Sequence, residues 1–158
     1  MFTIEPITDI HRAFVDQQIV ENWAGPFIVT RGRLFDIRTN PGFVAMAGGQ
    51  VAGYVLYWIE DGQCEVTVLE SLRENRGIGG AMINAVIEAA KDMGCRRVWL
   101  ATTNDNVHAI RFYQKFGFSL CAVHIDAIAE ARKLKPQIPT MGIDGIPIEH
   151  EFEFEIIV

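Results

Sequence analysis

The sequence predicts one α+β domain over residues 1–158, in which a single mixed, mostly antiparallel central sheet is flanked by helices. The chain has 158 residues, of which 49% are hydrophobic, and this is enough for one domain with a core. Strand-like segments joined by Gly48-Gly49 and Asp61-Gly62 are typical of an antiparallel meander. Segments with apolar residues at helical spacing then alternate with further strands, which predicts helices packed on the sheet.

The first half of the chain contains a helix and the meander. Apolar residues at helical spacing predict the helix, and the breaker Asn40-Pro41-Gly42 predicts a loop before the meander. The predicted elements are a helix over residues 9–22, a short strand over 27–30, a polar loop over 31–42, and strands over 43–47, 51–60 and 63–70.

The second half alternates helices and strands. Gly94 and Gly117 suit the positions just after two helices, and Asn106 suits an N-cap. The predicted elements are helices over 79–93 and 107–116, strands over 97–102 and 118–124, a short helix over 126–135, and a Pro/Gly-rich loop over 136–147. In the last strand, apolar residues alternate with Glu151, Glu153 and Glu155, which predicts one solvated face, or the border of a site for a cationic acceptor.

Composition excludes several function classes. A net charge of −6 argues against nucleic acid as a partner, because phosphate binding needs a basic surface. No metal is expected, since the chain has neither C-x-x-C nor H-E-x-x-H. The thiols of Cys64, Cys95 and Cys121 are predicted to be buried and reduced in a cytoplasmic protein. No signal peptide is expected, and the uncharged stretch 42–59 is predicted to form strands rather than a membrane span, because glycines interrupt it.

The most informative segment is the glycine-rich turn that precedes the helix at 79–93. Gly77, Gly79 and Gly80 lack Cβ atoms, so a ligand can approach the backbone closely. Free N–H groups and the dipole at a helix start favour an anion, and Arg73 and Arg76 add positive charge. The pattern matches neither a Rossmann nor a Walker A loop. Taken alone, the turn is equally compatible with a purely structural role.

A second motif follows one strand later, in the segment Asn106-Val107-His108-Ala109-Ile110-Arg111-Phe112-Tyr113-Gln114-Lys115-Phe116-Gly117-Phe118. Together the two motifs resemble the GNAT (general N-acetyltransferase) superfamily, over roughly residues 43–124. The turn is similar to that family's [QR]-x-x-G-x-[GA] loop, and the later segment to its N-x-x-A-x-x-x-Y-x-x-x-G-F helix. The family's Gln or Arg falls on Glu74 here, so Arg73 or Arg76 is expected to supply the charge instead.

The resemblance implies a GNAT-like acyl-CoA-binding fold and transfer of an acetyl group from acetyl-CoA to an amine by direct attack. The implied general acid is Tyr113, which would protonate the leaving thiolate. The other implied contacts are all with acetyl-CoA: Val68 and Leu69 for the pantetheine arm, the N–H groups of Gly77, Ile78, Gly79 and Gly80 for the pyrophosphate with Arg73 and Arg76 beside them, and Asn106 at the start of its helix.

An attacking amine must also lose a proton, and two carboxylates of the strand at 63–70 are candidates. The family often carries a base at the position of Glu65. Glu65 and Glu70 are separated by an odd number of residues, so in a regular strand they face opposite sides unless a bulge intervenes. Glu65 is the predicted base, and a solvated strand carboxylate is an equally weighted interpretation.

Three function classes compete for this sequence. An acetyl-CoA-dependent N-acetyltransferase is the leading hypothesis. A GNAT-like module that binds acyl-CoA without turnover is the second, and an unrelated phosphate-binding α/β protein is the third. The acceptor is left open between a small-molecule and a peptide amine, although the net acidity favours a cationic one. A homodimer is suggested by the family only.

Overall fold

The computed structural model describes all residues from 1 to 158, and seven of its strands form a mostly antiparallel sheet in the order β1-β4-β5-β6-β7-β9-β8. Two further strands, β2 and β3, form a separate hairpin. The strands are β1 (Thr3–Pro6), β2 (Phe27–Thr30), β3 (Arg33–Asp36), β4 (Gly42–Ala47), β5 (Gln50–Glu60), β6 (Gln63–Ser71), β7 (Arg97–Thr103), β8 (Ser119–His124) and β9 (Glu151–Ile157). The helices are α1 (Asp9–Asn22), α2 (Ile78–Asp92), α3 (Val107–Phe116) and α4 (Ala127–Leu134), with a 3-10 turn at Ile143–Gly145.

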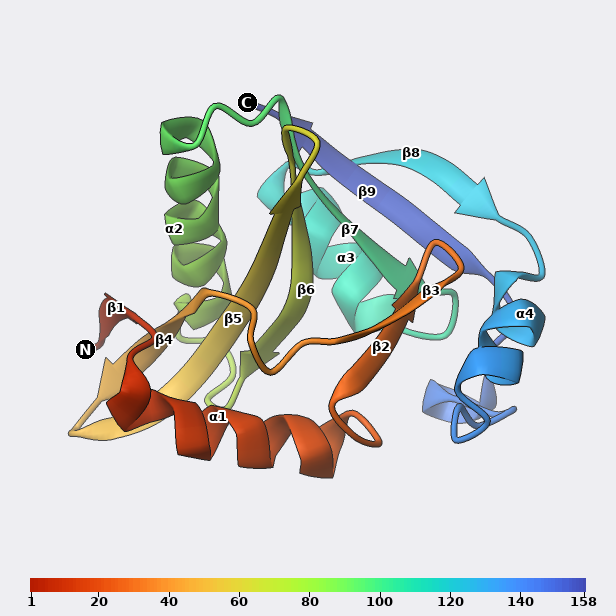
Figure 1. Cartoon of the computed structure of the whole chain (residues 1–158), viewed down its shortest axis with the longest axis horizontal. Helices are drawn as coiled ribbons and strands as arrows, with labels where there is room; N and C mark the ends of the chain where they lie inside the picture. Colours follow the sequence, from red (N-terminus) through yellow and green to blue (C-terminus); the bar gives the residue numbers. More distant parts are fainter. The chain divides into compact units, whose positions relative to one another are not determined.

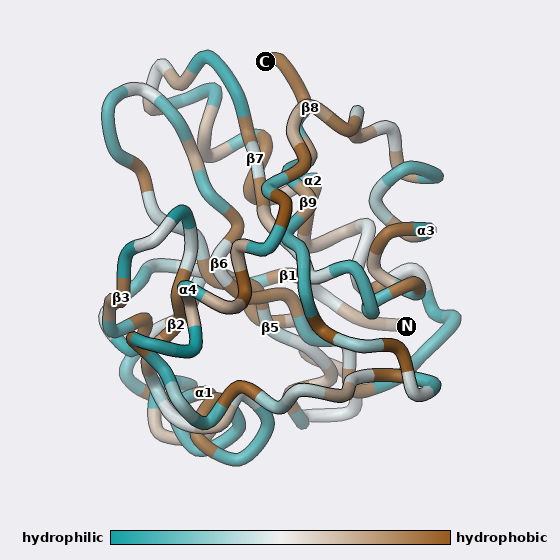
Figure 2. Tube along the Cα trace, turned by 90° about the vertical axis from the view of Figure 1, so that its right-hand side faces the viewer, coloured by the Kyte–Doolittle hydropathy of each residue, from teal (hydrophilic) through white to brown (hydrophobic).

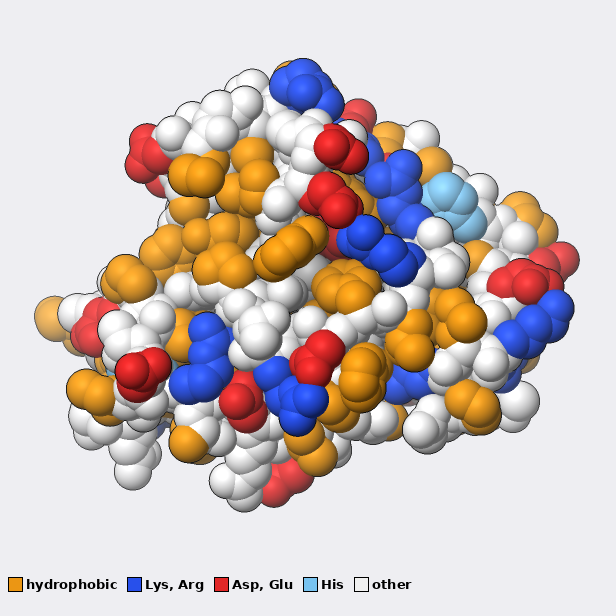
Figure 3. Space-filling view, in the orientation of Figure 1, with side chains coloured by type: hydrophobic (Ala, Val, Ile, Leu, Met, Phe, Trp, Pro, Cys, Tyr) orange, Lys and Arg blue, Asp and Glu red, His pale blue; other side chains and the backbone are white.

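The chain divides into two compact units, which are described separately. The first comprises residues 1–26, 37–98 and 157–158, and the second comprises residues 27–36 and 99–156. Figure 1 shows the elements of both. In the hydropathy view, hydrophobic residues follow β5, whereas the turn between β2 and β3 is hydrophilic (Figure 2). Acidic and basic side chains are interspersed on the face drawn in Figure 3.

The first unit is built on the antiparallel strands β1, β4, β5 and β6. The helix α2 packs against β4, β5 and β6 (Figure 1). A Cβ atom at Gly53 would lie 3.0 Å from the side chains of Ile78 and Met82, so the helix approaches β5 closely there. The next residue, Tyr54, points to the opposite face, where its hydroxyl lies beside Asn22 and Trp23 at the end of α1. Helices therefore cover both faces of this part of the sheet.

The second unit contains the antiparallel pair β8–β9, the helices α3 and α4, and the β2–β3 hairpin. Its core is aromatic: the ring of Tyr113 makes edge contacts with Phe112 and Phe118, with centroids 5.2 and 5.4 Å away. Phe154 from β9 lies 6.3 Å from the same ring. These contacts hold α3 on β9, and they fix Tyr113 in a single environment.

The structure confirms the predicted fold class and departs from the prediction in two places near the N-terminus. The strand β1 was not predicted. The predicted loop over 31–42 is wrong in its first part, because β3 pairs with β2. The positive φ angles of Arg31 (50°) and Gly32 (76°) form the tight two-residue turn that makes this hairpin possible. An arginine is an unusual residue for that conformation, so the turn carried no sequence signal.

Two predictions about burial are also wrong. In β9, Glu151 and Glu153 are only 7% and 5% exposed, although the alternating pattern predicted a solvated acidic face. Other residues of the second unit surround them, and these are described below. Cys64 and Cys95 are buried as predicted, but Cys121 is exposed. None of the helices has the length and apolar character needed to cross a membrane.

Candidate functional site

The glycine-rich turn lies between the end of β6 and the start of α2 in the first unit. Gly77 has a φ of 74° and occupies the N-cap position of α2, a left-handed conformation that glycine adopts without steric cost. A Cβ atom at Gly77 would meet nothing within 4 Å, so its backbone angle and not a close contact requires glycine. The turn therefore sets the direction in which α2 leaves β6.

The start of α2 exposes backbone donors. The first intrahelical bond runs from the N–H of Ala81 to the carbonyl of Gly77, at 3.1 Å, so the N–H groups of Ile78, Gly79 and Gly80 precede the helical ladder. The helix has neither a side-chain cap nor an acidic residue in its first turn. This helix end can hold an anion, because no carboxylate of the cap or of the first helical turn neutralises its dipole and its donors.

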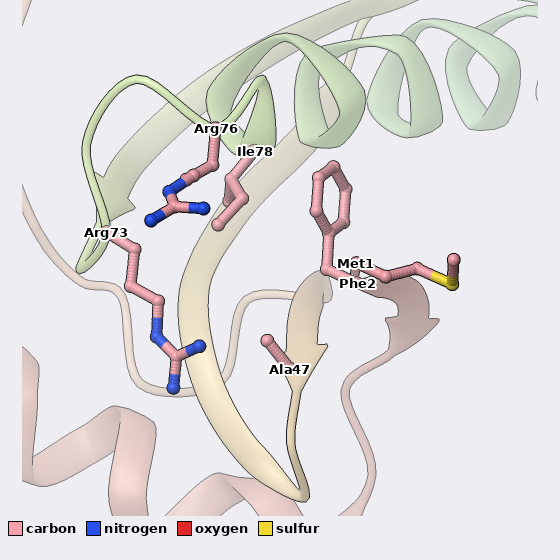
Figure 4. A pocket seen from close by; sticks show the side chains of 6 residues that line it. All are labelled: Met1, Phe2, Ala47, Arg73, Arg76 and Ile78. Carbon is pink, nitrogen blue, oxygen red and sulfur yellow. The ribbon is translucent and has the colours of Figure 1, made fainter.

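Two arginines add positive charge beside this helix end. Arg73 and Arg76 line a pocket of about 250 Å³ together with Ile78, with Ala47 at the end of β4 and with Phe2, which precedes β1. Figure 4 shows both guanidinium groups extending from the turn into this pocket. Glu74, which stands where the family motif has Gln or Arg, is exposed and does not line the pocket. The charge at the turn is therefore basic, as expected from the sequence.

A bulge in β6 changes the relation between the two candidate bases. The β5–β6 register shifts between Leu56 and Tyr57, so that Trp58 pairs with Glu65 while Tyr54 pairs with Glu70. Residues opposite each other in an antiparallel ladder share a face. Since Tyr54 and Trp58 lie on one face of β5, Glu65 and Glu70 lie on one face of β6. The expectation for a regular strand does not apply, because the bulge adds one residue.

The bulge residue itself is anchored. The hydroxyl of Thr67 donates to the carboxamide of Asn40 at 2.9 Å, and both residues are buried. Arg12 of α1 in turn donates to the backbone carbonyls of Arg38 and Asn40, at 3.1 Å each. The segment before β4 is thus held to the bulge by side-chain hydrogen bonds, and these contacts stabilise the shared orientation of the two glutamates.

The two glutamates differ in their surroundings. Glu65 is 6% exposed. Burial raises the pKa of Glu70, and the neighbouring indole N–H of Trp23 lowers it in part. Burial and the charge of Glu70 raise the pKa of Tyr54 to about 12. Trp23, Tyr54 and Glu70 therefore form a polar group under the end of α1, which the sequence did not indicate because its members are far apart in the chain.

Val68 and Leu69 lie in β6 between the bulge and the glycine-rich turn. They pair with Leu56 and Val55 of β5, and Val68 is buried. Both residues lie near the end of β6 that leads to the glycine-rich turn, as predicted. Their contact with a ligand stays a prediction.

Asn106 and Tyr113 belong to the second unit. The Oδ1 atom of Asn106 accepts a hydrogen bond from the N–H of Ala109 at 3.2 Å, so Asn106 is the N-cap of α3 as predicted. Tyr113, two turns later, is 8% exposed within the aromatic core, and burial raises its pKa well above the ordinary value. Its phenol therefore keeps its proton at neutral pH, which is the state a general acid requires. The role of both residues toward a ligand stays a prediction.

Comparison with known proteins agrees with this geometry. A family model described as the acetyltransferase (GNAT) family matches residues 8–118. The uncharacterized protein YdhI of Bacillus subtilis is 37% identical over 159 aligned residues, which cover 100% of this chain and 99% of that protein.

Two solved structures share the fold. An acetyltransferase from Bacillus subtilis in complex with CoA has a TM-score of 0.72 at 18% identity, covering 100% of this chain and 99% of that one. A GNAT family acetyltransferase from Elizabethkingia anophelis with acetyl-CoA bound has a TM-score of 0.71 at 18% identity, covering 99% and 98%. At this identity the structural likeness concerns the fold.

Proposed function

The chain belongs to the acetyltransferase (GNAT) family and is an acetyl-CoA-dependent acyltransferase, and on this premise we propose that it transfers the acetyl group to a primary amine by direct attack. The observation that carries the proposal is the start of α2. There, a left-handed Gly77, three backbone donors and two arginines surround a space with no carboxylate from the first helical turn. This donor set suits the pyrophosphate of acetyl-CoA.

In the proposed reaction, the N–H groups of Ile78, Gly79 and Gly80 and the side chains of Arg73 and Arg76 hold the pyrophosphate. The backbone of Val68 and Leu69 binds the pantetheine arm as an added strand would. Asn106 contributes through its amide nitrogen, because its amide oxygen already caps α3. These roles rest on the family motif and on the positions of the residues in their own units.

The proton transfers are assigned to two side chains. Glu65 accepts a proton from the acceptor ammonium through water, and the neutral nitrogen forms the new C–N bond with the acetyl carbonyl carbon. The C–S bond breaks, and Tyr113 gives its proton to the CoA thiolate. The nitrogen loses its second proton as the C–S bond breaks, and this proton passes through solvent to the Tyr113 phenolate. Glu65 releases the proton that it accepted to solvent, so the products are an N-acetylamine, CoA and one proton. The high pKa of Tyr113 supports this assignment, since the residue reaches the reaction protonated.

Calorimetric titration of the protein with acetyl-CoA, desulfo-CoA and ATP tests the cofactor assignment. We expect micromolar binding of acetyl-CoA and desulfo-CoA, and weak binding of ATP. An amine screen with detection of the released thiol then tests the transfer itself. Absence of binding to any CoA species would contradict the proposal. Binding without thiol release for any amine would favour a catalytically silent acyl-CoA-binding module.

A further inference from the structure

The second unit holds a cation against an aromatic ring and two buried carboxylates. The guanidinium carbon of Arg31, at the tip of the β2–β3 hairpin, lies 4.9 Å from the centroid of the Trp99 ring. Its Nε atom lies 3.8 Å from the carboxylate of Glu153, and its backbone N–H donates to Glu151. We call the indole of Trp99 with the carboxylates of Glu151 and Glu153 the cation cage.

The cage is built by neighbouring elements of one unit. Glu151 and Glu153 are two residues apart in β9 and therefore share a face, and His124 of β8 pairs with Glu151 on that same face. The imidazole of His124 lies 3.3 Å from Glu153, and the thiol of Cys121 lies 3.5 Å from the same carboxylate. Carboxylates buried to this degree need a positive partner, and an indole face attracts a cation directly.

The hairpin tip is suited to leave the cage. The side chain of Arg31 is 50% exposed, whereas Glu153 beneath it is 6% exposed. The neighbouring Thr30 is buried, and its hydroxyl finds no hydrogen-bond partner in the protein. At the other end of the hairpin, the carbonyl of Phe27 accepts a hydrogen bond of 2.7 Å from Lys135, which fixes the base of the hairpin independently of the contacts of Arg31.

We propose that the cation cage binds the second cationic group of a small amine acceptor. The guanidinium of Arg31 occupies the cage in the free protein, and the acceptor displaces it on binding. The acceptor class is therefore an alkyl amine that carries an ammonium or guanidinium group besides the amine that is acetylated. This inference rests on the proposed function for the acetylated amine, but the cage itself binds a cation whether or not acetyl-CoA is present.

Arg31 and a cationic ligand compete for the cage, and this competition determines how a substitution of Arg31 changes the affinity for the ligand. If the cage is open in only a fraction of the molecules, the apparent affinity is the intrinsic affinity multiplied by that fraction. Removing the guanidinium should therefore strengthen the binding of a dication, whereas removing a cage carboxylate should weaken it. Arg33, two residues away in the same hairpin, provides a matched control, because its guanidinium lies over Phe35, 5.1 Å from that ring centroid.

The test is calorimetric titration of the full chain with agmatine, which has one primary amine and one guanidinium, and with 1-butanol, which has an alkyl chain and no cationic group. In Arg31→Ala we expect agmatine to bind about tenfold more tightly than in the wild type. In Glu153→Gln we expect binding about tenfold weaker. Arg33→Ala should match the wild type, and 1-butanol should bind weakly to all four proteins.

Arg31→Lys separates competition from loosening of the hairpin, because it keeps a cation at the tip. If Arg31→Lys binds agmatine as weakly as the wild type, the proposal holds. If it binds as tightly as Arg31→Ala, or if Arg31→Ala does not gain affinity, the proposal is overturned. Thermal unfolding of each variant confirms that the proteins are folded. Because no titration contains acetyl-CoA, failure of the acetyl-CoA experiment above would leave this result interpretable.

Discussion

The proposed role of Tyr113 as general acid depends on a single atom, its phenolic oxygen. The ring is packed among Phe112, Phe118 and Phe154, so Tyr113→Phe keeps the aromatic contacts and removes only the hydroxyl. We expect turnover to fall about 100-fold or more, since general acid catalysis contributes on that order. The affinity for acetyl-CoA should stay unchanged. Thiol release measured under saturating amine, with calorimetry for acetyl-CoA, checks both expectations.

Tyr57→Phe is the matched control for this substitution. Tyr57 lies in β5 and stacks on Phe43, with ring centroids 6.1 Å apart, and it has no assigned role. It should retain wild-type turnover. If Tyr113→Phe also retained full turnover, Tyr113 would be only a core residue and the thiolate would have to take its proton from water.

Because of the bulge in β6, Glu65 and Glu70 lie on the same face of the strand, so orientation does not decide which of them is the general base. An experiment can decide between them. We expect Glu65→Gln to lower turnover more at neutral pH than at high pH, because a neutral acceptor amine no longer needs a base. Glu70→Gln should keep the wild-type pH profile. The measurement is kcat against pH for the three proteins. A pH-dependent loss in Glu70→Gln instead of Glu65→Gln would transfer the role to Glu70.

At the scale of elements, the backbone conformation at the start of α2 should affect both the stability of the protein and its binding of acetyl-CoA. Gly77 at the N-cap has a φ of 74°, and Gly94 just after the C-terminus of the same helix has a φ of 73°. Gly77→Ala and Gly94→Ala should each lower the free energy of unfolding by about 1–2 kcal/mol, because both place a Cβ atom in the left-handed region. Urea unfolding measures this loss.

Only one of the two substitutions should change the affinity for acetyl-CoA. Gly77 orients the three N–H groups assigned to the pyrophosphate, whereas Gly94 lies at the far end of α2. Gly77→Ala should therefore weaken acetyl-CoA binding severalfold, and Gly94→Ala should leave it unchanged. Equal affinities for acetyl-CoA in the two variants would show that the turn contributes nothing specific to binding.

The sequence predicts these elements well where their signals are local. The Asp61-Gly62 turn, the Asn106 cap and the glycines around α2 each act within a few residues, and the structure has the predicted strands and helices beside them. The β6 bulge was not predicted, because it is defined by the register with β5. The β2–β3 turn was missed because Arg31 adopts a positive φ without a sequence signal. Local signals thus predicted the glycine-rich turn and the helix after it, while pairing between strands decided the faces of the glutamates.

At the scale of the whole molecule, an acidic chain buries some of its own carboxylates. The net charge is −6, and Glu65, Glu151 and Glu153 are all less than 9% exposed. The alternating pattern of β9 was correctly predicted as a strand, but the pattern could not reveal that Arg31, 120 residues earlier in the chain, lies against its acidic face. Long-range contacts of this kind are the part of the candidate site that composition and periodicity leave open.

Buried carboxylates also determine how stability depends on pH. Burial raises the pKa values of Glu70 and Glu151 above 4.5 in the folded protein. Between 4.5 and these raised values, the folded protein holds protons that the unfolded chain has lost. These two groups therefore make the free energy of unfolding fall as the pH rises through that window. Their stabilising contribution is fully present below pH 4.5 and is lost as each carboxylate ionises.

Glu70→Gln and Glu151→Gln should each reduce this loss, because glutamine keeps the size of the side chain without the ionisation. Urea unfolding between about pH 5 and about pH 7 measures the slope, and Glu88→Gln on the surface of α2 controls for the loss of one acidic residue. We expect a smaller slope in both buried variants and the wild-type slope in Glu88→Gln. If all four proteins lost stability equally over this range, ionisation of the buried glutamates would not be the cause. The pH dependence of the fold would then lie with the surface charges.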